Sequence, residues 1–177
     1  MAEYAVTAIG RDRPGIVAAV SRALLDVDGN IEDSQMSILR GHFAVMLIVR
    51  VPDSVTGEEL AEHLGPVRDE IGLEAITFNP VDELEATMTP ATHVLTVYGA
   101  DHPGIVSGVS HVLAELGVNI TDLETRLAGA EDNPLYAMVM EIALGDVDEE
   151  RVESKLREVA HREAVEVSLR RLEAEAL

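Results

Sequence analysis

Two short segments of the chain combine residue types that could bind a small charged molecule. Each has the pattern Gly-x-Asp-x-Pro-Gly-Ile-Val, with key residues at Gly10, Asp12, Pro14 and Gly15 in the first segment and at Gly99, Asp101, Pro103 and Gly104 in the second. A Pro-Gly pair favours the start of a helix, where free N–H groups can bind a carboxylate. The aspartate just before that start can cap the same N–H groups or accept a hydrogen bond from a ligand ammonium. The sequence leaves both roles open.

An Asn-Ile pair recurs after each of these segments. The pairs are Asn30 with Ile31 and Asn119 with Ile120, followed by the weaker candidates Asp33 and Asp122. In a structural explanation, the asparagine satisfies a turn and the isoleucine packs in the core. In a functional explanation, the asparagine side chain and the isoleucine backbone hold the amino and carboxyl ends of a small zwitterion. Because each pair follows a helix and opens a strand, we expect it at the sheet end that carries the Gly-x-Asp-x-Pro-Gly turn.

Both motifs belong to one internal repeat with an offset of 89 residues. Within residues 4–39, 13 of 36 positions are identical to their partners in residues 93–128. Self-similarity of this length predicts two copies of one structural unit. We expect a first domain at residues 1–80, a second at residues 92–177, and a linker at residues 81–91, where prolines bracket a polar segment.

The hydrophobic pattern of each copy predicts the order strand, helix, strand, strand, helix, strand. Apolar residues recur at helical spacing at Ile16, Val20 and Leu24, for example. The expected fold class is therefore α+β, with two βαββαβ units in tandem, each a four-stranded antiparallel sheet with two helices on one face. The pair Gly65-Pro66 inside the second helix predicts a kink or a break there.

The charge balance limits the partners of the chain. Among its 177 residues, 13 Lys and Arg oppose 33 Asp and Glu, which gives a formal net charge of −20. Such a surface repels phosphate backbones and anionic lipids, so we expect no direct nucleic-acid partner and no membrane partner. The apolar run at residues 43–49 is far shorter than the roughly 20 residues of a membrane-spanning helix. No export signal is visible at the N-terminus, and a cytoplasmic location is expected.

Residues suited to catalysis or metal binding do not form a recognisable pattern. The sequence contains no cysteine, which excludes thiolate metal sites and cysteine nucleophiles. Its six histidines lack the compact spacing of metal ligands. The repeated Ser21 and Ser110 lie in helical segments and not at a nucleophile elbow. We therefore expect no catalytic residue, no metal and no cofactor, and predict that the chain is not an enzyme.

The combination of a strand ending in Gly-x-Asp-x-Pro-Gly-Ile-Val, an amphipathic helix and Asn-Ile-x-Asp resembles the ACT domain, a ligand-binding module with a ferredoxin-like fold. The resemblance covers residues 3–80 and 92–171, and it is to tandem ACT proteins of the glycine cleavage system transcriptional repressor type. It implies that a small molecule, typically an amino acid, binds at an interface between ACT units. The candidate ligand-binding residues are then Gly10, Asp12, Pro14, Gly15, Asn30, Ile31, Gly99, Asp101, Pro103, Gly104, Asn119 and Ile120. The copies differ at two positions, where Arg11 and Arg13 of the first correspond to Ala100 and His102 of the second, so their sites should not have equal affinity or selectivity.

Two functions follow as hypotheses. In the first, the chain is a non-enzymatic regulator: an amino acid binds at ACT interfaces and alters contact with a partner protein, for example in the transcriptional regulation of amino-acid metabolism. In the second, the chain is a structural or dimerisation module that has no ligand of its own and serves a separate enzyme. A homo-oligomer, most simply a dimer, is expected.

Overall fold

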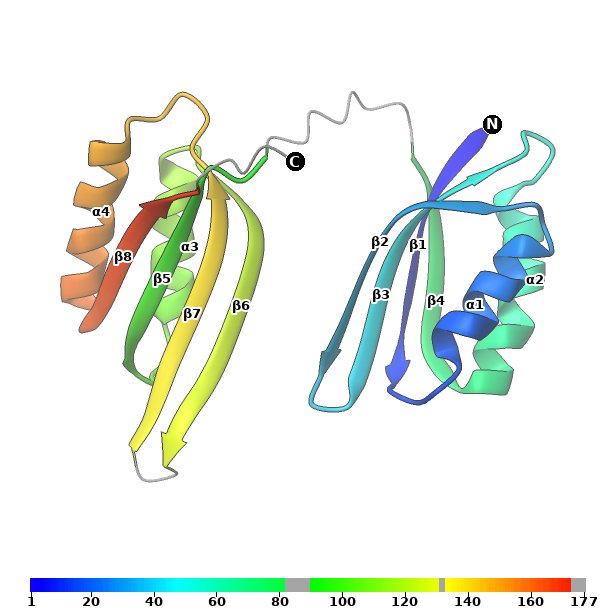
Figure 1. The fold of residues 1–177 in the computed structure, drawn as a ribbon, viewed down its shortest axis with the longest axis horizontal. Helices are drawn as coiled ribbons and strands as arrows, with labels where there is room; N and C mark the ends of the chain where they lie inside the picture. The colour runs from blue at the N-terminus through cyan, green and yellow to red at the C-terminus, as the bar shows by residue number, and fades with distance from the viewer. Residues whose placement is uncertain (82–89, 131–132, 173–177) are drawn as a thin grey trace. The chain divides into compact units, whose positions relative to one another are not determined.

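The computed structural model describes residues 1–81, 90–130 and 133–172. By its internal contacts the chain divides into two compact units, Met1–Ala86 and Thr87–Leu177 (Figure 1). Most of the predicted linker, residues 82–89, lies outside the described residues. Each unit is therefore considered by itself.

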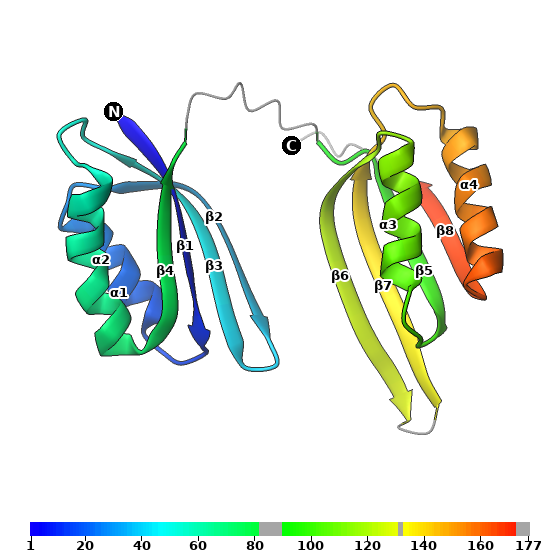
Figure 2. The same ribbon diagram turned by 180° about the vertical axis from the view of Figure 1, so that it is seen from behind.

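The first unit has the predicted order of elements. They are β1 (Ala2–Arg11), α1 (Ile16–Leu25), β2 (Asn30–Leu39), β3 (His42–Val51), α2 (Gly57–Ile71) and β4 (Leu73–Pro80). The strands form one sheet in the order β2-β3-β1-β4, and each neighbouring pair is antiparallel. Both helices lie on the same face of this sheet (Figures 1 and 2). The strand β2 is therefore one edge of the sheet, and β4 is the other.

The second unit repeats this topology. Its elements are β5 (His93–Ala100), α3 (Ile105–Glu115), β6 (Asn119–Ala130), β7 (Asn133–Ala143), α4 (Glu149–Arg162) and β8 (Val165–Arg171). The strand order is β6-β7-β5-β8, again antiparallel throughout. The predicted α+β class with two βαββαβ units is confirmed.

The core of each unit lies between the sheet and its two helices. In the first unit, alternate residues of the central strands, such as Val6 and Leu47, are buried against Leu60 and Leu64 of α2. Successive side chains of a strand point to opposite faces. The alternation therefore leaves the other sheet face open, and Met46 on that face is 55% exposed.

The helix α2 runs through Pro66 without a break, so of the predicted kink or break the break is wrong. The helix begins with a capping box, in which the side chain of Thr56 accepts from the N–H of Glu59 and the Glu59 carboxylate accepts from the N–H of Thr56. It ends at Gly72, which has a φ of 59°. Packing of Leu60 and Leu64 outweighs one missing backbone hydrogen bond on an exposed face.

Among the described residues, no helix has the length and apolarity needed to cross a membrane.

Candidate ligand-binding loops

The two Gly-x-Asp-x-Pro-Gly segments form the turns from β1 to α1 and from β5 to α3. In each turn the last glycine directly precedes the helix and has a positive φ, 98° at Gly15 and 115° at Gly104. Side chains other than hydrogen are strained in this conformation. Glycine at these two positions is therefore explained by the shape of the turn.

The first glycine of each segment has a packing role. A Cβ atom added at Gly10 would lie 3.0 Å from the Cα of Leu73 on β4, and one added at Gly99 would lie 2.7 Å from Cγ1 of Val165 on β8. These glycines let the end of the central strand approach its edge neighbour closely. The structure thus gives Gly10 and Gly99 a reason that needs no ligand.

The aspartates of the two loops do not cap the helices. The residues that cap α1 and α3 are Gly15 and Gly104, and neither helix start has a side-chain hydrogen bond. The backbone N–H of Asp12 donates to the carbonyl of Gly41, 2.9 Å away, and ties the loop to the β2–β3 hairpin. Both carboxylates are exposed. Of the two roles left open by the sequence, the capping role is not the one adopted.

The Asn-Ile pairs lie at the opposite end of the sheet from these loops, so the expectation that they share an end is wrong. Asn30 of β2 pairs with Arg50 of β3, and Arg50 also pairs with Glu3 near the start of β1. Gly10, near the end of β1, pairs with Phe43 at the other end of β3. Seven residues of β1 separate the two levels, roughly 23 Å at 3.3 Å per residue. The physical reason is that α1 carries the chain back along the sheet, so that β2 starts level with β1 and runs parallel to it.

The second unit has the same separation. There Ile120 pairs with Ile142, which faces His93 at the start of β5, while Gly99 pairs with Tyr136. A single unit therefore does not bring its loop and its Asn-Ile pair together.

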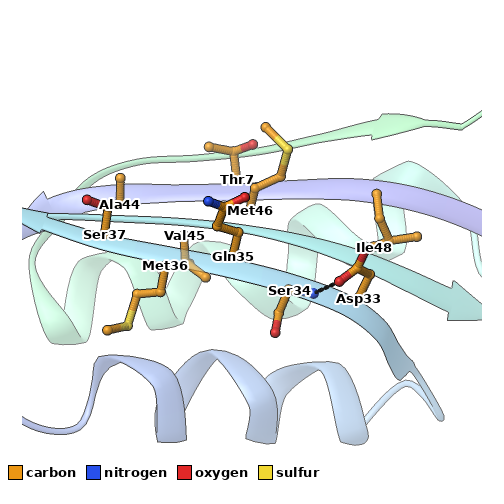
Figure 3. Close-up of a pocket in the computed structure, with 10 residues that line it drawn as sticks. All are labelled: Thr7, Asp33, Ser34, Gln35, Met36, Ser37, Ala44, Val45, Met46 and Ile48. Atoms are coloured by element: carbon orange, nitrogen blue, oxygen red, sulfur yellow. Dashed lines mark hydrogen bonds between the residues drawn. The ribbon is translucent and has the colours of Figure 1, made fainter. Parts of the chain in front are cut away.

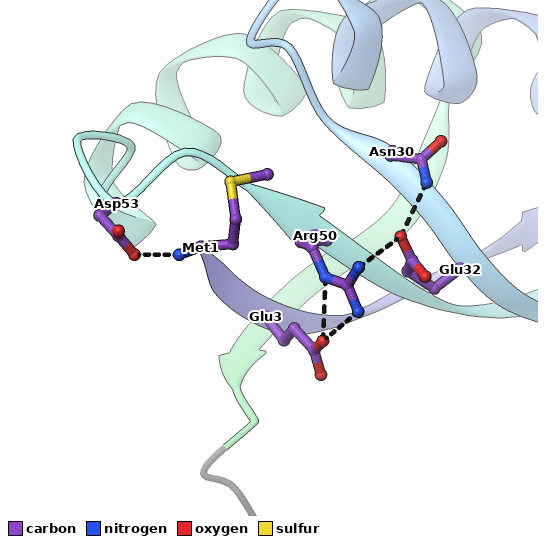
Figure 4. A network of polar contacts seen from close by, with 6 residues as sticks. All are labelled: Met1, Glu3, Asn30, Glu32, Arg50 and Asp53. Carbon is purple, nitrogen blue, oxygen red and sulfur yellow. Dashed lines mark hydrogen bonds and ion pairs between the residues drawn. The ribbon is translucent and has the colours of Figure 1, made fainter.

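The side chain of Asn30 belongs to a polar network within the first unit (Figure 4). Its side-chain amide donates to Oε1 of Glu32 at 2.8 Å, and the same oxygen lies 3.3 Å from Nη1 of Arg50. The guanidinium of Arg50 also donates to Glu3 through Nε and Nη2, at 3.2 and 3.0 Å. The hydrogen bond to Glu3, followed by the charge of Glu32, raises the pKa of Arg50. Asn30 thus has a structural partner within its own unit.

The second unit uses different residues at this end. His93 is 4% exposed, its Nδ1 lies 2.8 Å from Oγ1 of Thr92, and its Nε2 lies 3.4 Å from the carboxylate of Glu149. The hydroxyl of Thr92 also accepts from the N–H of Leu144. Sequence reasoning missed this cluster, because His93 aligns with Tyr4 in the repeat and gives no motif of its own.

A hollow of about 480 Å³ lies on the open face of the first sheet (Figure 3). Thr7, Gln35 and Met46 point into it from three strands, away from α1, and only the weak candidate Asp33 among the predicted residues lines it. The signal that could have found it is the lack of charge at Ala44, Met46 and Ile48, the outward positions of β3. Among the described residues, no group of three or more His, Asp or Glu is placed to hold a metal ion.

The fold defines a ferredoxin-like α+β protein with two copies of one βαββαβ module. A family model described as the ACT domain matches residues 5–78 and again residues 92–170. The chain belongs to the ACT domain family, and the resemblance read from the sequence is confirmed.

Individual relatives agree with this assignment. The chain is 30% identical over 129 residues to the glycine cleavage system transcriptional repressor of Escherichia coli, and the matched region covers 72% of this chain and 66% of that protein. It is 39% identical over 77 residues to a UPF0237 protein of Methanopyrus kandleri, covering 43% of this chain and 86% of the relative. A solved structure described as an unknown protein from Galdieria sulphuraria has a TM-score of 0.82 and 28% identity, and the match covers 97% of this chain and 99% of that one. Membership of this family supports a regulatory, ligand-binding role.

Proposed function

We propose that this protein is a cytoplasmic, non-enzymatic regulator that binds a small molecule, an amino acid, through the Gly-x-Asp-x-Pro-Gly loops at interfaces of its ACT units and signals to a partner protein. One observation carries the proposal. In both units an exposed aspartate carboxylate, Asp12 or Asp101, stands just before a helix whose first turn has no side-chain cap. Uncapped N–H groups and an unengaged carboxylate are complementary to the two ends of a zwitterion.

The division of labour in each loop follows from charge. The first-turn N–H groups of α1 or α3 and the positive end of the helix dipole favour the ligand carboxylate. The carboxylate of Asp12 or Asp101 favours the ligand ammonium, and a charge-assisted hydrogen bond of this kind is roughly twice as strong as a neutral one. The repeat of the whole arrangement in both units argues against a chance combination.

The Asn-Ile pairs enter this proposal through a second copy of the chain. The edge strand β2 is exposed along its whole length, including Met36 and Ile38 at 51% and 47%. If β2 pairs antiparallel with β2 of a second copy, the start of one strand lies beside the end of the other. The Asn30 and Ile31 of one copy then reach the loop end of its partner. We therefore place the proposed ligand site at the interface that this pairing of two β2 strands would form.

Signalling passes through protein contacts in this proposal. A net charge of −20 is unsuited to phosphate backbones, so a role in transcription would act through a DNA-binding protein. The regulated process we propose is amino-acid metabolism, because the relative in Escherichia coli is named for the glycine cleavage system. A ligand that favours one arrangement of the ACT units would alter the surface offered to that partner.

A thermal-shift panel of the twenty amino acids at millimolar concentration tests the ligand. A compound that binds only the folded state stabilises it by RT ln(1 + [L]/Kd), about 2.7 kcal/mol at a hundredfold excess over Kd. We expect a shift with one or two amino acids, and its loss in the double variant Asp12→Ala with Asp101→Ala. The matched control is Asp53→Ala with Asp146→Ala, which removes two exposed carboxylates that follow β3 and β7, at the end of each sheet opposite to its loop.

The outcomes of this panel separate the two functions. If both double variants retain the thermal shift, the amino acid binds at a site other than the two loops. No shift with any amino acid, in protein unfolded and refolded to remove a copurified ligand, would favour the structural or dimerisation module that serves a separate enzyme. Turnover of a substrate by the pure chain would contradict the non-enzymatic role.

A further inference from the structure

The two loops differ at one position that contacts the rest of the unit. In the second loop, Nε2 of His102 lies 2.7 Å from the carbonyl oxygen of Glu163, and Nδ1 lies 3.1 Å from the carbonyl oxygen of Pro103. Glu163 directly follows α4 and begins the turn to β8. The imidazole therefore joins the candidate ligand loop to a turn 61 residues away in the chain.

Both neighbours of this ring are acceptors. A neutral imidazole has one N–H group and can donate to one carbonyl, while its other nitrogen presents a lone pair. A protonated imidazole has two N–H groups and donates to both. Only the charged ring thus satisfies the two contacts that the structure contains.

The charged groups around His102 act in the same direction. The Glu163 carboxylate, whose side chain is 17% exposed, and the carboxylate of Asp101 favour the protonated ring, and Arg162 pairs with Glu163 at 2.9 Å. The two backbone hydrogen bonds, to Pro103 and then to Glu163, contribute most, and together these groups raise the pKa of His102 above its ordinary value of 6.5. The stabilisation that the second proton adds is therefore fully present below about pH 6.5 and is lost as the pH rises through the raised pKa.

The first loop has a permanent charge at the same position. Arg13 replaces the histidine, and its Nη2 lies 3.0 Å from where a Cβ of Gly72 would be. Gly72 is in the turn from α2 to β4, with a φ of 59°, and its counterpart Ala164 has a φ of 51°. Arg13 and His102 therefore contact equivalent turns of the two units. A guanidinium does not lose its proton in proteins.

We infer that His102 is a pH-operated latch on the second loop. When protonated, the ring donates to both carbonyls and ties the Gly99–Gly104 segment to the turn between α4 and β8; when the proton leaves, the ring can donate to only one of the two carbonyls, and the tie to the turn is weakened. Arg13 keeps the first loop independent of pH over the same range. The effect of the latch on ligand affinity rests on the proposed function, but the latch itself does not.

Nuclear magnetic resonance of the full chain between pH 5 and 9 tests the latch without any ligand. The imidazole signals of His102 should titrate with a pKa above 6.5. The backbone amide chemical shifts of the non-proline residues in 99–104 should change with the same midpoint, while those of the non-proline residues in 10–15 stay constant. A His102 that titrates at or below 6.5, or loop amides that do not follow it, would overturn the inference.

Reciprocal substitutions distinguish a latch from a merely structural contact. His102→Arg should abolish the titration of the second loop, and Arg13→His should give the first loop a titration of its own. His111→Arg is the matched control, because His111 is an exposed histidine on α3 of the same unit, 72% exposed, and should leave the loop titration unchanged. A pH-dependent step that persists in His102→Arg contradicts the latch. Amino-acid binding measured at pH 6 and pH 8 then reports the proposed function separately.

Discussion

The residues that recur in both loops fall into two groups, one with a structural role and one without. Gly10 and Gly99 are required by close packing on β4 and β8, and Gly15 and Gly104 by a positive φ. The aspartates have no such explanation: they neither cap a helix nor lie in the core. Repetition in the sequence therefore has a structural cause at the glycines, and the aspartates are left as the side chains whose repetition points to a ligand.

The packing role of Gly10 is testable by stability. In Gly10→Ala the new methyl group meets the backbone of Leu73 at 3.0 Å, so the free energy of unfolding should fall by about 1–3 kcal/mol. Gly57→Ala is the control, because Gly57 begins α2 and a Cβ there would lie in ordinary contact, 3.7 Å from the nearest atom, on Tyr4. It should leave the free energy of unfolding unchanged or raise it by up to about 1 kcal/mol. Urea unfolding curves measure both, and equal effects of the two substitutions would contradict the packing role.

Among the elements, the edge strands stand out because no residue of β2 is buried, and none is buried in residues 119–128 of its counterpart β6. The helices pack over the other strands and leave Ile31, Met36 and Ile38 on the helix side of β2 partly uncovered. An exposed edge presents unpaired N–H and C=O groups, which favour pairing with another strand. The antiparallel pairing of two β2 strands would cover this edge in both copies at once.

A charge on this edge should weaken self-association. Ile38→Lys places an ammonium where a pairing strand would bury an isoleucine, and burial of such a side chain contributes about 1.5–3 kcal/mol. Because a twofold dimer contains the change twice, we expect at least a tenfold increase in the dimer dissociation constant, measured by analytical ultracentrifugation.

The control for this substitution is Leu25→Lys on α1, at a position that is 60% exposed and outside β2. It should leave the dissociation constant unchanged. A chain that is monomeric at every concentration, or a dimer that Ile38→Lys leaves intact, would remove β2 as the interface.

The sequence predicts the elements well and their mutual placement less well. The apolar run at residues 43–49 and the helical spacing at Ile16, Val20 and Leu24 carry the βαββαβ order, because the hydrophobic pattern is a local property. The distance between Asn30 and Gly10 is not local: it depends on which end of the sheet the helix α1 reaches. Likewise His102 is visible in the sequence only as a difference from Arg13, since its partner Glu163 is brought to it by the fold of the whole unit.

For the molecule as a whole, charge decides which partners are available. The excess of 20 negative charges is spread over a chain with only 13 basic residues, and several of these are already paired, such as Arg50 and Arg157. Few cations are left to neutralise phosphates. This charge balance supports the proposal that the chain acts through another protein and not on DNA directly.

A gel-shift assay with the pure protein tests this conclusion. We expect no shift of duplex DNA even at 50 mM salt, where phosphate contacts are strong. Addition of a DNA-binding partner should be needed before the chain enters a complex with DNA. A direct complex whose affinity falls steeply with salt would contradict the expectation, because that slope counts phosphates neutralised by the protein.

The distance between Asn30 and the Gly10 loop has a consequence for how a cell would use this protein. If one copy supplies the loop and another the Asn-Ile pair, capture of the amino acid and encounter of two chains are thermodynamically linked, and each promotes the other. The response would then depend on the abundance of the protein as well as on that of its ligand. A cell could tune the threshold of the switch by changing expression alone, with no change in the binding site.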